Sequence, residues 1–257
     1  MKDIFSIEGK VALVTGGTRG IGAMIARGFV EHGARVYVSA RKADACEQAA
    51  AELSRHGVCR ALPADCGTQA GCDALAAALA AREERLHVLV NNAGANWGAP
   101  LSEYPDSAWD KLLALNVKGV FHLTRACLPL LEKAASPDDP ARVINIGSVD
   151  GLRVPMLETY AYSTSKAAVA HLTRVLAARL APQHVTVNCV APGPFESKMM
   201  AETLTRFRDA IVASVPLGRI GRPEDMAGVA IYLASRASAY VTGAIIPVDG
   251  GILVRAS

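Results

Sequence analysis

The stretch TGGTRGIG, residues 15–22, decides the fold class of this chain. It directly follows an apolar run at residues 11–14 and opens a stretch near residues 20–32 in which apolar side chains recur with helical periodicity. A glycine pattern alone carries little weight. A glycine-rich turn between a strand and an amphipathic helix, however, is typical of dinucleotide binding, and this context favours it strongly over an ordinary turn.

Three glycines of this turn have separate roles in a dinucleotide site. Gly16 permits the tight turn, Gly20 lets the main chain approach a pyrophosphate, and Gly22 allows the helix to pack closely on the strand. The helix N-terminus adds unpaired N–H groups and the positive end of the helix dipole, which both favour phosphate. We also expect the residues between these glycines to contact the cofactor: Thr18, Arg19 and Ile21.

The end of the second predicted strand indicates which dinucleotide is bound. In NAD-binding proteins of this type, an acid about 20 residues after the glycine turn binds the ribose 2′-hydroxyl. Here Ala40 has that place, and Arg41 and Lys42 follow it. Arg19 can approach the same spot, and arginine binds phosphate with two parallel hydrogen bonds. The sequence therefore favours NADP(H), with Arg19 and Arg41 at the 2′-phosphate, over the alternative that both are solvated surface charges.

Short β-branched runs alternate with Ala-, Leu-, Glu- and Arg-rich amphipathic stretches along the chain. Most runs are apolar at consecutive positions, as in strands covered on both faces. The alternation predicts an α/β fold: one Rossmann-type, doubly wound parallel sheet of about seven strands with helices on both faces, in a single domain over residues 1–257. The predicted strands are residues 11–14, 36–39, 59–62, 88–90, 143–146, 185–190 and 245–248, and the predicted helices lie near residues 20–32, 43–56, 69–84, 106–133, 160–181 and 223–235.

Residues 194–216 interrupt this alternation after the sixth predicted strand. Met199, Met200, Leu204 and Phe207 recur there at broadly helical spacing. Two interpretations are equally compatible with this pattern: a lid over a binding site, or a packed surface helix.

Composition narrows the class of protein. The chain has 257 residues, 51% of them hydrophobic and 20% charged, and a net charge of +3 without a cluster of Lys and Arg, which argues against nucleic-acid binding. The N-terminus lacks the apolar core of a signal peptide, and no run of about 18 apolar residues occurs, so we expect a cytoplasmic protein without membrane contact. The six cysteines show no CxxC spacing and the six histidines no HxxxH pair, so we expect no disulfide and no metal.

Two tyrosines precede a lysine in TYAYSTSKAAV, residues 159–169. Tyr162 and Lys166 are four residues apart, so on a helix they share one face. Tyr160 is six residues before Lys166, about 600° of helical rotation, and therefore points to a different side, where it lines a substrate entrance or packs. A phenol is a weak base at neutral pH, and we expect a nearby ammonium to lower the pKa of Tyr162 towards the working range.

Ser148 and Asn116 complete the candidate chemistry. Ser148 ends the fifth predicted strand, and the carboxyl ends of such strands face the ligand crevice. Its hydroxyl could hydrogen-bond a substrate carbonyl or simply cap a turn. Asn116 is a poor residue for a helix interior; it could kink the helix and hold a water, or be an exposed amide.

Together these residues closely resemble the short-chain dehydrogenase/reductase family over nearly the whole chain. Several motifs in order and at suitable spacing are far more specific than any one alone. The matching pieces are residues 15–22, Asp65, NNAG at residues 91–94, Asn116, Ser148, the pair Tyr162 and Lys166, Asn188 with Pro192 and Gly193, and VDGG at residues 248–251.

The resemblance implies a catalytic tetrad of Asn116, Ser148, Tyr162 and Lys166. Tyr162 would donate the proton during ketone reduction while Ser148 holds the carbonyl. Lys166 would bind the nicotinamide ribose and tune Tyr162, and Asn116 would anchor a water that relays protons to Lys166.

The resemblance also implies the other cofactor contacts and the assembly. The adenosine side would be lined by Asp65, Cys66, Asn92, Ala93 and Gly94, and the nicotinamide side by Tyr162, Lys166, Pro192, Gly193, Phe195 and Ser197. Members are commonly tetramers, so the resemblance implies a homotetramer formed through the helices near residues 106–133 and 160–181.

Within the family, the chain looks most like 3-oxoacyl-[acyl-carrier-protein] reductases, including the branch associated with rhamnolipid synthesis. It departs from them at Asp138 and Asp139 in the loop AASPDDPA and at Gln183, where basic residues often receive the acidic carrier protein. The gap between Ser148 and Tyr162 is also about one residue longer than usual. These departures argue against docking of acyl carrier protein. The expected substrate is therefore the ketone of a 3-oxoacyl thioester or a similar β-keto compound, with a coenzyme A ester or a different ketone as alternatives to the carrier-bound form.

Two alternatives remain open at this stage. One is another secondary alcohol dehydrogenase, acting on a sugar, a polyol or a steroid. The other is a binding protein that senses NADP(H) without turnover, which the intact set of Asn, Ser, Tyr and Lys disfavours because a pure binder needs no proton relay.

Overall fold

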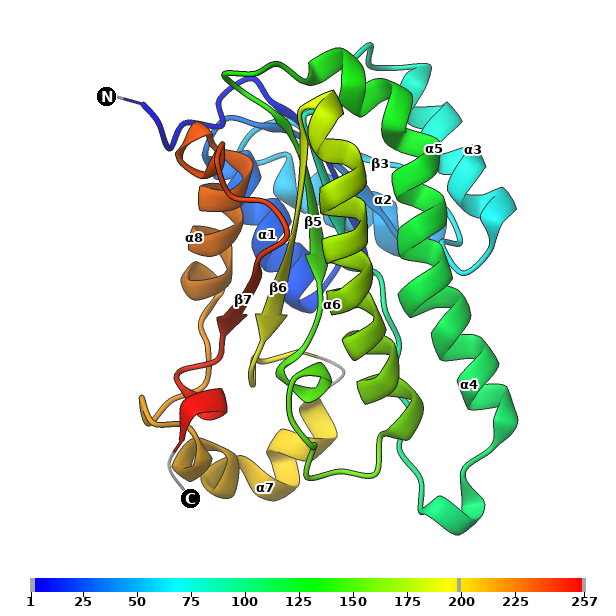
Figure 1. Ribbon diagram of the computed structural model, residues 1–257, viewed down its shortest axis with the longest axis vertical. Coiled ribbons are helices and arrows are strands. Elements are labelled where there is room, and N and C mark those ends of the chain that lie inside the picture. The colour runs from blue at the N-terminus through cyan, green and yellow to red at the C-terminus, as the bar shows by residue number, and fades with distance from the viewer. Residues whose placement is uncertain (1–2, 198–199, 256–257) are drawn as a thin grey trace.

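The computed structural model describes residues 3–197 and 200–255 and contains one parallel sheet of seven strands. The strand order is β3-β2-β1-β4-β5-β6-β7, and every neighbouring pair is parallel. This confirms the predicted doubly wound α/β class (Figure 1). The strands are β1 (Val11–Thr15), β2 (Arg35–Ser39), β3 (Cys59–Ala61), β4 (Val88–Asn91), β5 (Ala141–Ile146), β6 (Val185–Pro192) and β7 (Ile245–Val248).

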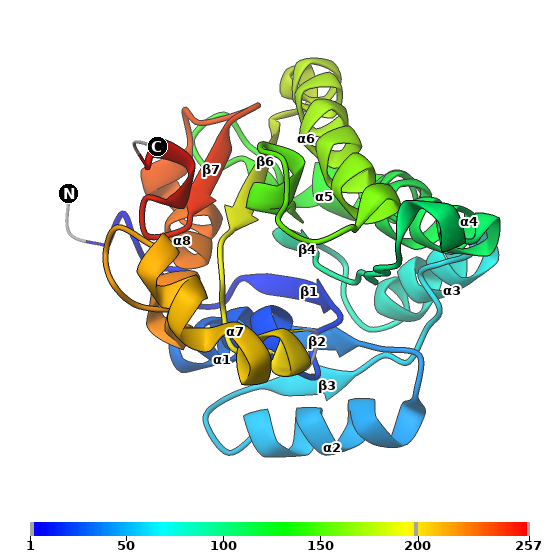
Figure 2. The same ribbon diagram turned by 90° about the horizontal axis from the view of Figure 1, so that it is seen from below.

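Helices cover both faces of the sheet because most of its strands are apolar on both sides. The helices are α1 (Gly20–Glu31), α2 (Ala43–Leu53), α3 (Gln69–Ala80), α4 (Asp106–Leu113), α5 (Gly119–Ala134), α6 (Tyr160–Leu180), α7 (Ala201–Ser214) and α8 (Pro223–Ala234). One core cluster joins α1, α2 and α8 to the sheet, and a second joins α3, α5 and α6 to its other face (Figure 2). No helix within the described residues is both long and apolar enough to cross a membrane.

The strand order reverses its direction of growth between β1 and β4. The chain moves outward from β1 to β3, then returns to β4 beside β1 and moves the other way to β7. In such sheets, ligands bind beyond the carboxyl ends of the strands at this switch point. The strand arrowheads in Figure 1 point to that edge, where α7 also lies.

The helix predicted near residues 106–133 contains a wide turn. Between α4 and α5, residues Ala114–Lys118 form a π-helical segment, and the Gly119 N–H donates to the Ala114 carbonyl five residues earlier. Asn116 lies in this segment and is buried. Extra residues in a helical turn are often found at functional sites, because they redirect one side chain without ending the helix.

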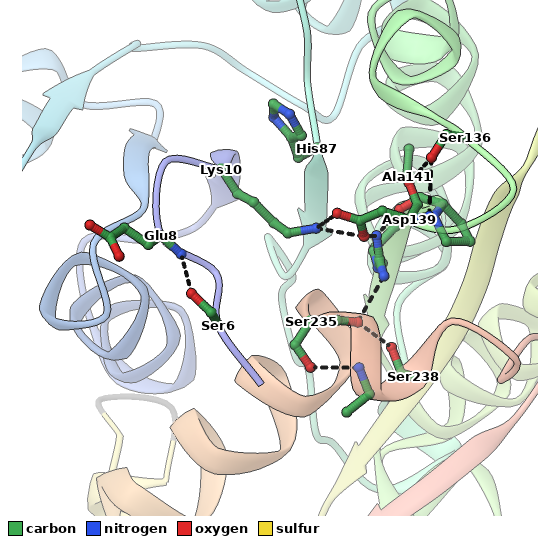
Figure 3. Close-up of polar contacts among 12 residues, drawn as sticks. Ser6, Glu8, Lys10, His87, Ser136, Asp139, Ala141, Ser235 and Ser238 are labelled. Atoms are coloured by element: carbon green, nitrogen blue, oxygen red, sulfur yellow. Dashed lines mark hydrogen bonds and ion pairs between the residues drawn. The ribbon is translucent and has the colours of Figure 1, made fainter. Parts of the chain in front are cut away.

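A buried ion network lies at the opposite, amino-terminal edge of the sheet (Figure 3). Lys10 Nζ lies 2.8 Å from both carboxylate oxygens of Asp139. Arg142 is only 1% exposed; its guanidinium also meets Asp139 and donates a 2.8 Å hydrogen bond to the Ser235 carbonyl. Asp139 is therefore paired with two cations rather than presented as a free acidic charge. Asp138 beside it is exposed, and the expectation about carrier-protein docking stays a prediction.

Candidate active site

A large cavity of about 1220 Å³ lies at the carboxyl edge of the sheet. It brings together residues that the sequence predicted from motifs spread over nearly 200 positions. The predicted residues that line it are Gly16, Thr18, Arg19, Gly20, Ile21, Arg41, Asp65, Cys66, Asn92, Ala93, Gly94, Ser148, Tyr162, Lys166, Pro192 and Ser197. Asn116, Gly22, Gly193 and Phe195 do not line it.

The glycine turn has the geometry that its sequence predicted. Gly16 and Gly20 have φ angles of +64° and +54°, which side chains with a Cβ rarely adopt. A Cβ on Gly22 would lie 2.3 Å from the Gly16 carbonyl oxygen, so only glycine lets α1 approach the turn this closely. Arg19 precedes α1 without a side-chain cap, and no acid lies in the first turn of the helix, which leaves this end favourable for an anion.

The loop after β4 braces this turn from the side. The Thr15 hydroxyl accepts hydrogen bonds from the N–H groups of Asn92 and Ala93, both at 3.0 Å. The Asn92 amide in turn donates to the carbonyls of Thr15 and Gly16. The Asn92 side chain therefore fixes the shape of the glycine turn, in addition to lining the cavity.

A basic corner of the cavity lies where β2 ends. Arg19, Arg41 and Lys42 are exposed and line this part of the wall together with Ser39 and Ala40. The side chain directly after β2, that of Ala40, is thus a methyl group rather than a carboxylate. This arrangement suits a phosphate and offers no acceptor for a ribose 2′-hydroxyl at Ala40.

Tyr162 and Lys166 lie one helical turn apart on α6 and both line the cavity, as their spacing predicted. Lys166 Nζ lies 5.7 Å from the centroid of the Tyr162 ring and donates a 2.7 Å hydrogen bond to the Ile146 carbonyl. Gly94 faces this amine, since a Cβ there would lie 3.6 Å from Lys166 Nζ. Tyr160 is not part of the cavity wall.

The pKa of Tyr162 moves opposite to the direction expected from the lysine. Burial raises the pKa of Tyr162 to about 12, and the adjacent Ser148 hydroxyl opposes this only in part. Burial also lowers the pKa of Lys166 to about 8. The expectation failed because the Lys166 amine is directed at the Ile146 carbonyl, so the cost of burying a phenolate exceeds the attraction of the ammonium.

Ser148 is the second residue after β5, and its hydroxyl makes a defined hydrogen bond. Its Oγ accepts a 3.1 Å hydrogen bond from the Asp150 N–H. This bond uses a lone pair of the oxygen and leaves the hydroxyl hydrogen free to donate into the cavity. Ser148 therefore caps a turn, as one sequence interpretation held, and can also donate to a carbonyl oxygen.

Asn116 is buried behind the cavity wall and holds the main chain of the loop after β4. Its Oδ1 accepts from the Ala95 N–H at 2.9 Å, and its Nδ2 donates to the Ala95 carbonyl at 3.0 Å and to Ser165 Oγ at 3.0 Å. The Ser165 hydroxyl donates onward to the Tyr162 carbonyl. Both hydrogens of the Asn116 side-chain amide thus donate within the protein. A water could be held only by the side-chain or main-chain oxygen of Asn116, and this role stays a prediction.

Phe195 and Gly193 lie beside the cavity rather than in its wall. The Phe195 ring is 2% exposed and belongs to the core, and a Cβ on Gly221 would lie 2.4 Å from it. A Cβ on Gly193 would meet the Asp249 main chain at 2.8 Å. Any cofactor contact of Phe195 must therefore come from its main chain, because its side chain is committed to packing.

Helix α7 supplies the outer wall of the cavity. Thr203 and Phe207 line it with Glu202 and Arg206, while Leu204 is buried. Phe207 has φ −133°, which breaks the regular helix at this point. Met199 lies outside the described residues, and the lid function stays a prediction.

Several wall residues were not predicted from the sequence. They cluster on the side away from the glycine turn: Trp97, Gly98, Lys111, Leu157, Glu158 and Thr159. Trp97 lies three residues after the NNAG motif, so its position in the sequence indicated that it lies near the site. Its side chain alone indicated no role there. Glu158 lies in a segment without periodicity, and its contacts depend on tertiary structure.

Comparison with known proteins identifies extensive similarity. The model of a family described as enoyl-(acyl carrier protein) reductase matches residues 16–253. A rhamnolipids biosynthesis 3-oxoacyl-[acyl-carrier-protein] reductase of Pseudomonas aeruginosa is 51% identical, over 98% of this chain and 99% of that protein. A second 3-oxoacyl-[acyl-carrier-protein] reductase of the same organism, FabG, is 38% identical, over 96% of this chain and 98% of that protein. Among solved structures, the Pseudomonas aeruginosa RhlG/NADP active-site complex has a TM-score of 0.95 at 50% identity, covering 99% of this chain and 100% of that chain.

Proposed function

Because the chain belongs to the short-chain dehydrogenase/reductase family, we propose that it is an NADPH-dependent reductase acting on the ketone of 3-oxoacyl thioesters or similar β-keto compounds. The observation that carries this proposal is the shared cavity. One wall holds a phosphate-binding turn with a basic corner, and the other holds Ser148, Tyr162 and Lys166.

The residues of the cavity fit NADP(H). The open N-terminus of α1 and the glycines of the turn would hold the pyrophosphate, and Arg19 and Arg41 the 2′-phosphate. Asp65 and Cys66 would flank the adenine, and Lys166 would bind the nicotinamide ribose. When bound, the cofactor supplies the hydride for reduction.

The side chains of the chain itself supply the proton and the polarisation. The free hydroxyl hydrogen of Ser148 would donate to the ketone oxygen, which gains negative charge as the carbonyl is reduced. Tyr162 Oη would then give its proton to that oxygen, forming the O–H bond of the alcohol. A pKa of about 12 keeps the phenol protonated at neutral pH, which suits a proton donor. Lys166 carries the nearby positive charge that would stabilise the resulting phenolate.

The thioester substrate is supported by the relatives named above, two of which are described as 3-oxoacyl-[acyl-carrier-protein] reductases. Apolar side chains in the cavity wall also suit an acyl chain. Trp97, Leu157 and Phe207 line the cavity and are 41%, 46% and 49% exposed, so they offer apolar surface that an acyl chain could cover. We include in the proposal that acyl carrier protein or coenzyme A carries the acyl group.

Assembly and location belong to the same proposal. Phe121 on α5 and Val175 on α6 are 42% and 45% exposed, which gives these two helices apolar surface for a homotetramer. The six cysteines are free, as expected for a protein of the cytoplasm. Light scattering after size exclusion would report the mass of the assembly.

The decisive experiment is NADPH oxidation by the purified protein with a panel of ketones. We expect activity with acetoacetyl-CoA and longer 3-oxoacyl thioesters, much faster with NADPH than with NADH. Tyr162→Phe should lower kcat by roughly 10²- to 10⁴-fold, the usual contribution of a general acid. Tyr160→Phe should keep most of kcat. A clear preference for a sugar or steroid, or a dead Tyr160→Phe beside an active Tyr162→Phe, would overturn the proposal.

A further inference from the structure

The loop between β4 and α4 forms the side of the cavity that the residues proposed to hold the cofactor do not occupy. We call residues 95–104 the entrance loop. Its residues Trp97 to Pro100 line the cavity, and residues 157–159 line it before α6 begins. The entrance loop and the segment before α6 are far apart in sequence, so contacts between them set the shape of this side of the cavity.

The Tyr104 hydroxyl joins these two segments at the start of α6. It accepts a 3.2 Å hydrogen bond from the Ala161 N–H and donates a 3.3 Å hydrogen bond to the Trp97 carbonyl. Thr159, the residue before α6, makes no side-chain cap. Tyr104 therefore caps the helix from outside, one residue before Tyr162, while it holds the main chain of Trp97.

The Tyr104 ring is held on two sides by other aromatic rings. It meets the Tyr160 ring edge to face, with centroids 5.2 Å apart at 84°, and the Trp109 ring at 6.2 Å and 65°. Such edge-to-face pairs are favourable beyond the area they bury. Tyr160 is thus a packing partner of Tyr104, which explains why it faces away from the cavity.

Glu158 fixes the middle of the entrance loop through the same group of residues. Its Oε1 accepts a 2.6 Å hydrogen bond from the Tyr160 hydroxyl and a 3.3 Å hydrogen bond from the Leu101 N–H. Its carbonyl accepts from the Ala99 N–H at 3.2 Å. With Asn116 joining Ala95 to α6 through Ser165, the loop is tied to α6 or its approach at its start, middle and end.

We propose that Tyr104 is a positioning residue that sets substrate affinity by holding the entrance loop against the helix that carries Tyr162. Neither Tyr104 nor Tyr160 lines the cavity, so both act through residues that do, Trp97 and Glu158. The inference rests on the proposed function, because the entrance loop would contact the acyl chain of the ketone. The phosphate turn has separate supports in Thr15 and Asn92, so NADPH affinity should not depend on Tyr104.

The kinetic test compares Tyr104→Phe and Tyr160→Phe with Tyr37→Phe. Tyr37 is the control because its hydroxyl, like that of Tyr160, donates to a carboxylate, here Glu83 Oε1 at 2.9 Å, and because it lies away from the cavity. We expect KM for acetoacetyl-CoA to rise about three- to tenfold in Tyr104→Phe, since its loss removes hydrogen bonds at the loop and the helix start. A smaller rise is expected in Tyr160→Phe. KM for NADPH and kcat should stay within about twofold, and Tyr37→Phe should change none of the three constants.

Hydrogen exchange on the protein without substrate provides a second measurement that is independent of catalysis. We expect faster exchange in residues 95–104 and 160–163 of Tyr104→Phe than in wild type, and no such change in Tyr37→Phe. If the wild-type protein showed no reductase activity, the proposed function would be refuted. Hydrogen exchange would still test whether Tyr104 holds the entrance loop. Unchanged exchange in the loop, or a loss of NADPH affinity equal to the loss of ketone affinity, would overturn the inference.

Discussion

Lys166 places an amine in a buried position where its hydrogen bond goes to a neutral carbonyl, that of Ile146. Among the residues that the structure describes, no carboxylate pairs with this amine. Burial lowers the pKa of Lys166 to about 8, and the nearby Cys189 opposes this only in part. An ammonium held this way costs folding free energy. The lost folding free energy is consistent with a functional role, because the proposed chemistry needs a positive charge beside Tyr162.

Replacing Lys166 should therefore stabilise the fold while it abolishes activity. The folded pKa is about 8 against an ordinary 10.5, so the cost is complete below pH 8. Between pH 8 and 10.5 the unfolded chain binds more protons, and the stability of wild type rises with pH. We expect Lys166→Met to gain roughly 2 kcal/mol at pH 7, after the lost hydrogen bond is allowed for, and much less at pH 9.5. Urea unfolding at both values measures this, with exposed Lys133→Met as control; destabilisation at pH 7 would contradict it.

At the residue scale, sequence predicts which side chains meet but not how each is directed. The four-residue spacing places Tyr162 and Lys166 on one face of a helix wherever that helix lies. The hydrogen bond from Lys166 to Ile146 depends on how α6 packs beside β5, which no local pattern contains. For the same reason the aromatic contact between Tyr104 and Tyr160, 56 positions apart, could not be predicted.

At the scale of elements, the close contact between α1 and the glycine turn shapes the turn that we propose binds the cofactor pyrophosphate. A Cβ on Gly22 would lie 2.3 Å from the Gly16 carbonyl oxygen and 2.4 Å from Asn92 Nδ2. Gly22→Ala should therefore push α1 from the turn, cost roughly 1–3 kcal/mol of stability and weaken NADPH binding at least about tenfold. Gly228→Ala on α8 is the control, since no other segment of the described chain lies within 4 Å of its added Cβ, and it should be neutral or slightly stabilising. Denaturation and NADPH fluorescence titration measure both; a Gly22→Ala variant with wild-type binding would refute this account.

Most elements were predictable because their periodicity reflects burial that the sheet imposes. The strand β1 is buried at every position, as the consecutive apolar residues 11–14 predicted. The helix expected near residues 106–133 was the main departure, since the π-helical segment at Asn116 arises from hydrogen bonds to Ala95 and Ser165. Propensity indicated an unusual position there, but only the tertiary partners determine the form that it takes.

At the scale of the whole molecule, one edge of the sheet carries the candidate active site and the other carries contacts that stabilise the fold. The carboxyl edge holds the cavity, and the amino edge holds the ion network of Lys10, Asp139 and Arg142 (Figure 3). This network joins the start of β1 and β5 to the end of α8 through the Ser235 carbonyl. Substitutions at the amino edge should therefore change stability without changing kinetics.

Asp139→Ala tests this separation of tasks. Its loss would leave Lys10 and Arg142, 7% and 1% exposed, facing each other without a counter-charge, and we expect a loss of roughly 2–3 kcal/mol because Asp139 itself is partly exposed. Burial would raise the pKa of Asp139, but Lys10 and Arg142 outweigh it and lower that pKa below its ordinary 3.8. Its contribution is therefore present above about pH 4 and disappears as the pH falls through the lowered pKa, so the stability difference from wild type should disappear in acid.

Asp138→Ala is the control for this prediction; Asp138 is exposed, and the variant should keep wild-type stability. Urea unfolding between pH 3 and 7 measures the difference, and KM for NADPH should match wild type in both variants; a kinetic defect in Asp139→Ala would show that the two edges are coupled.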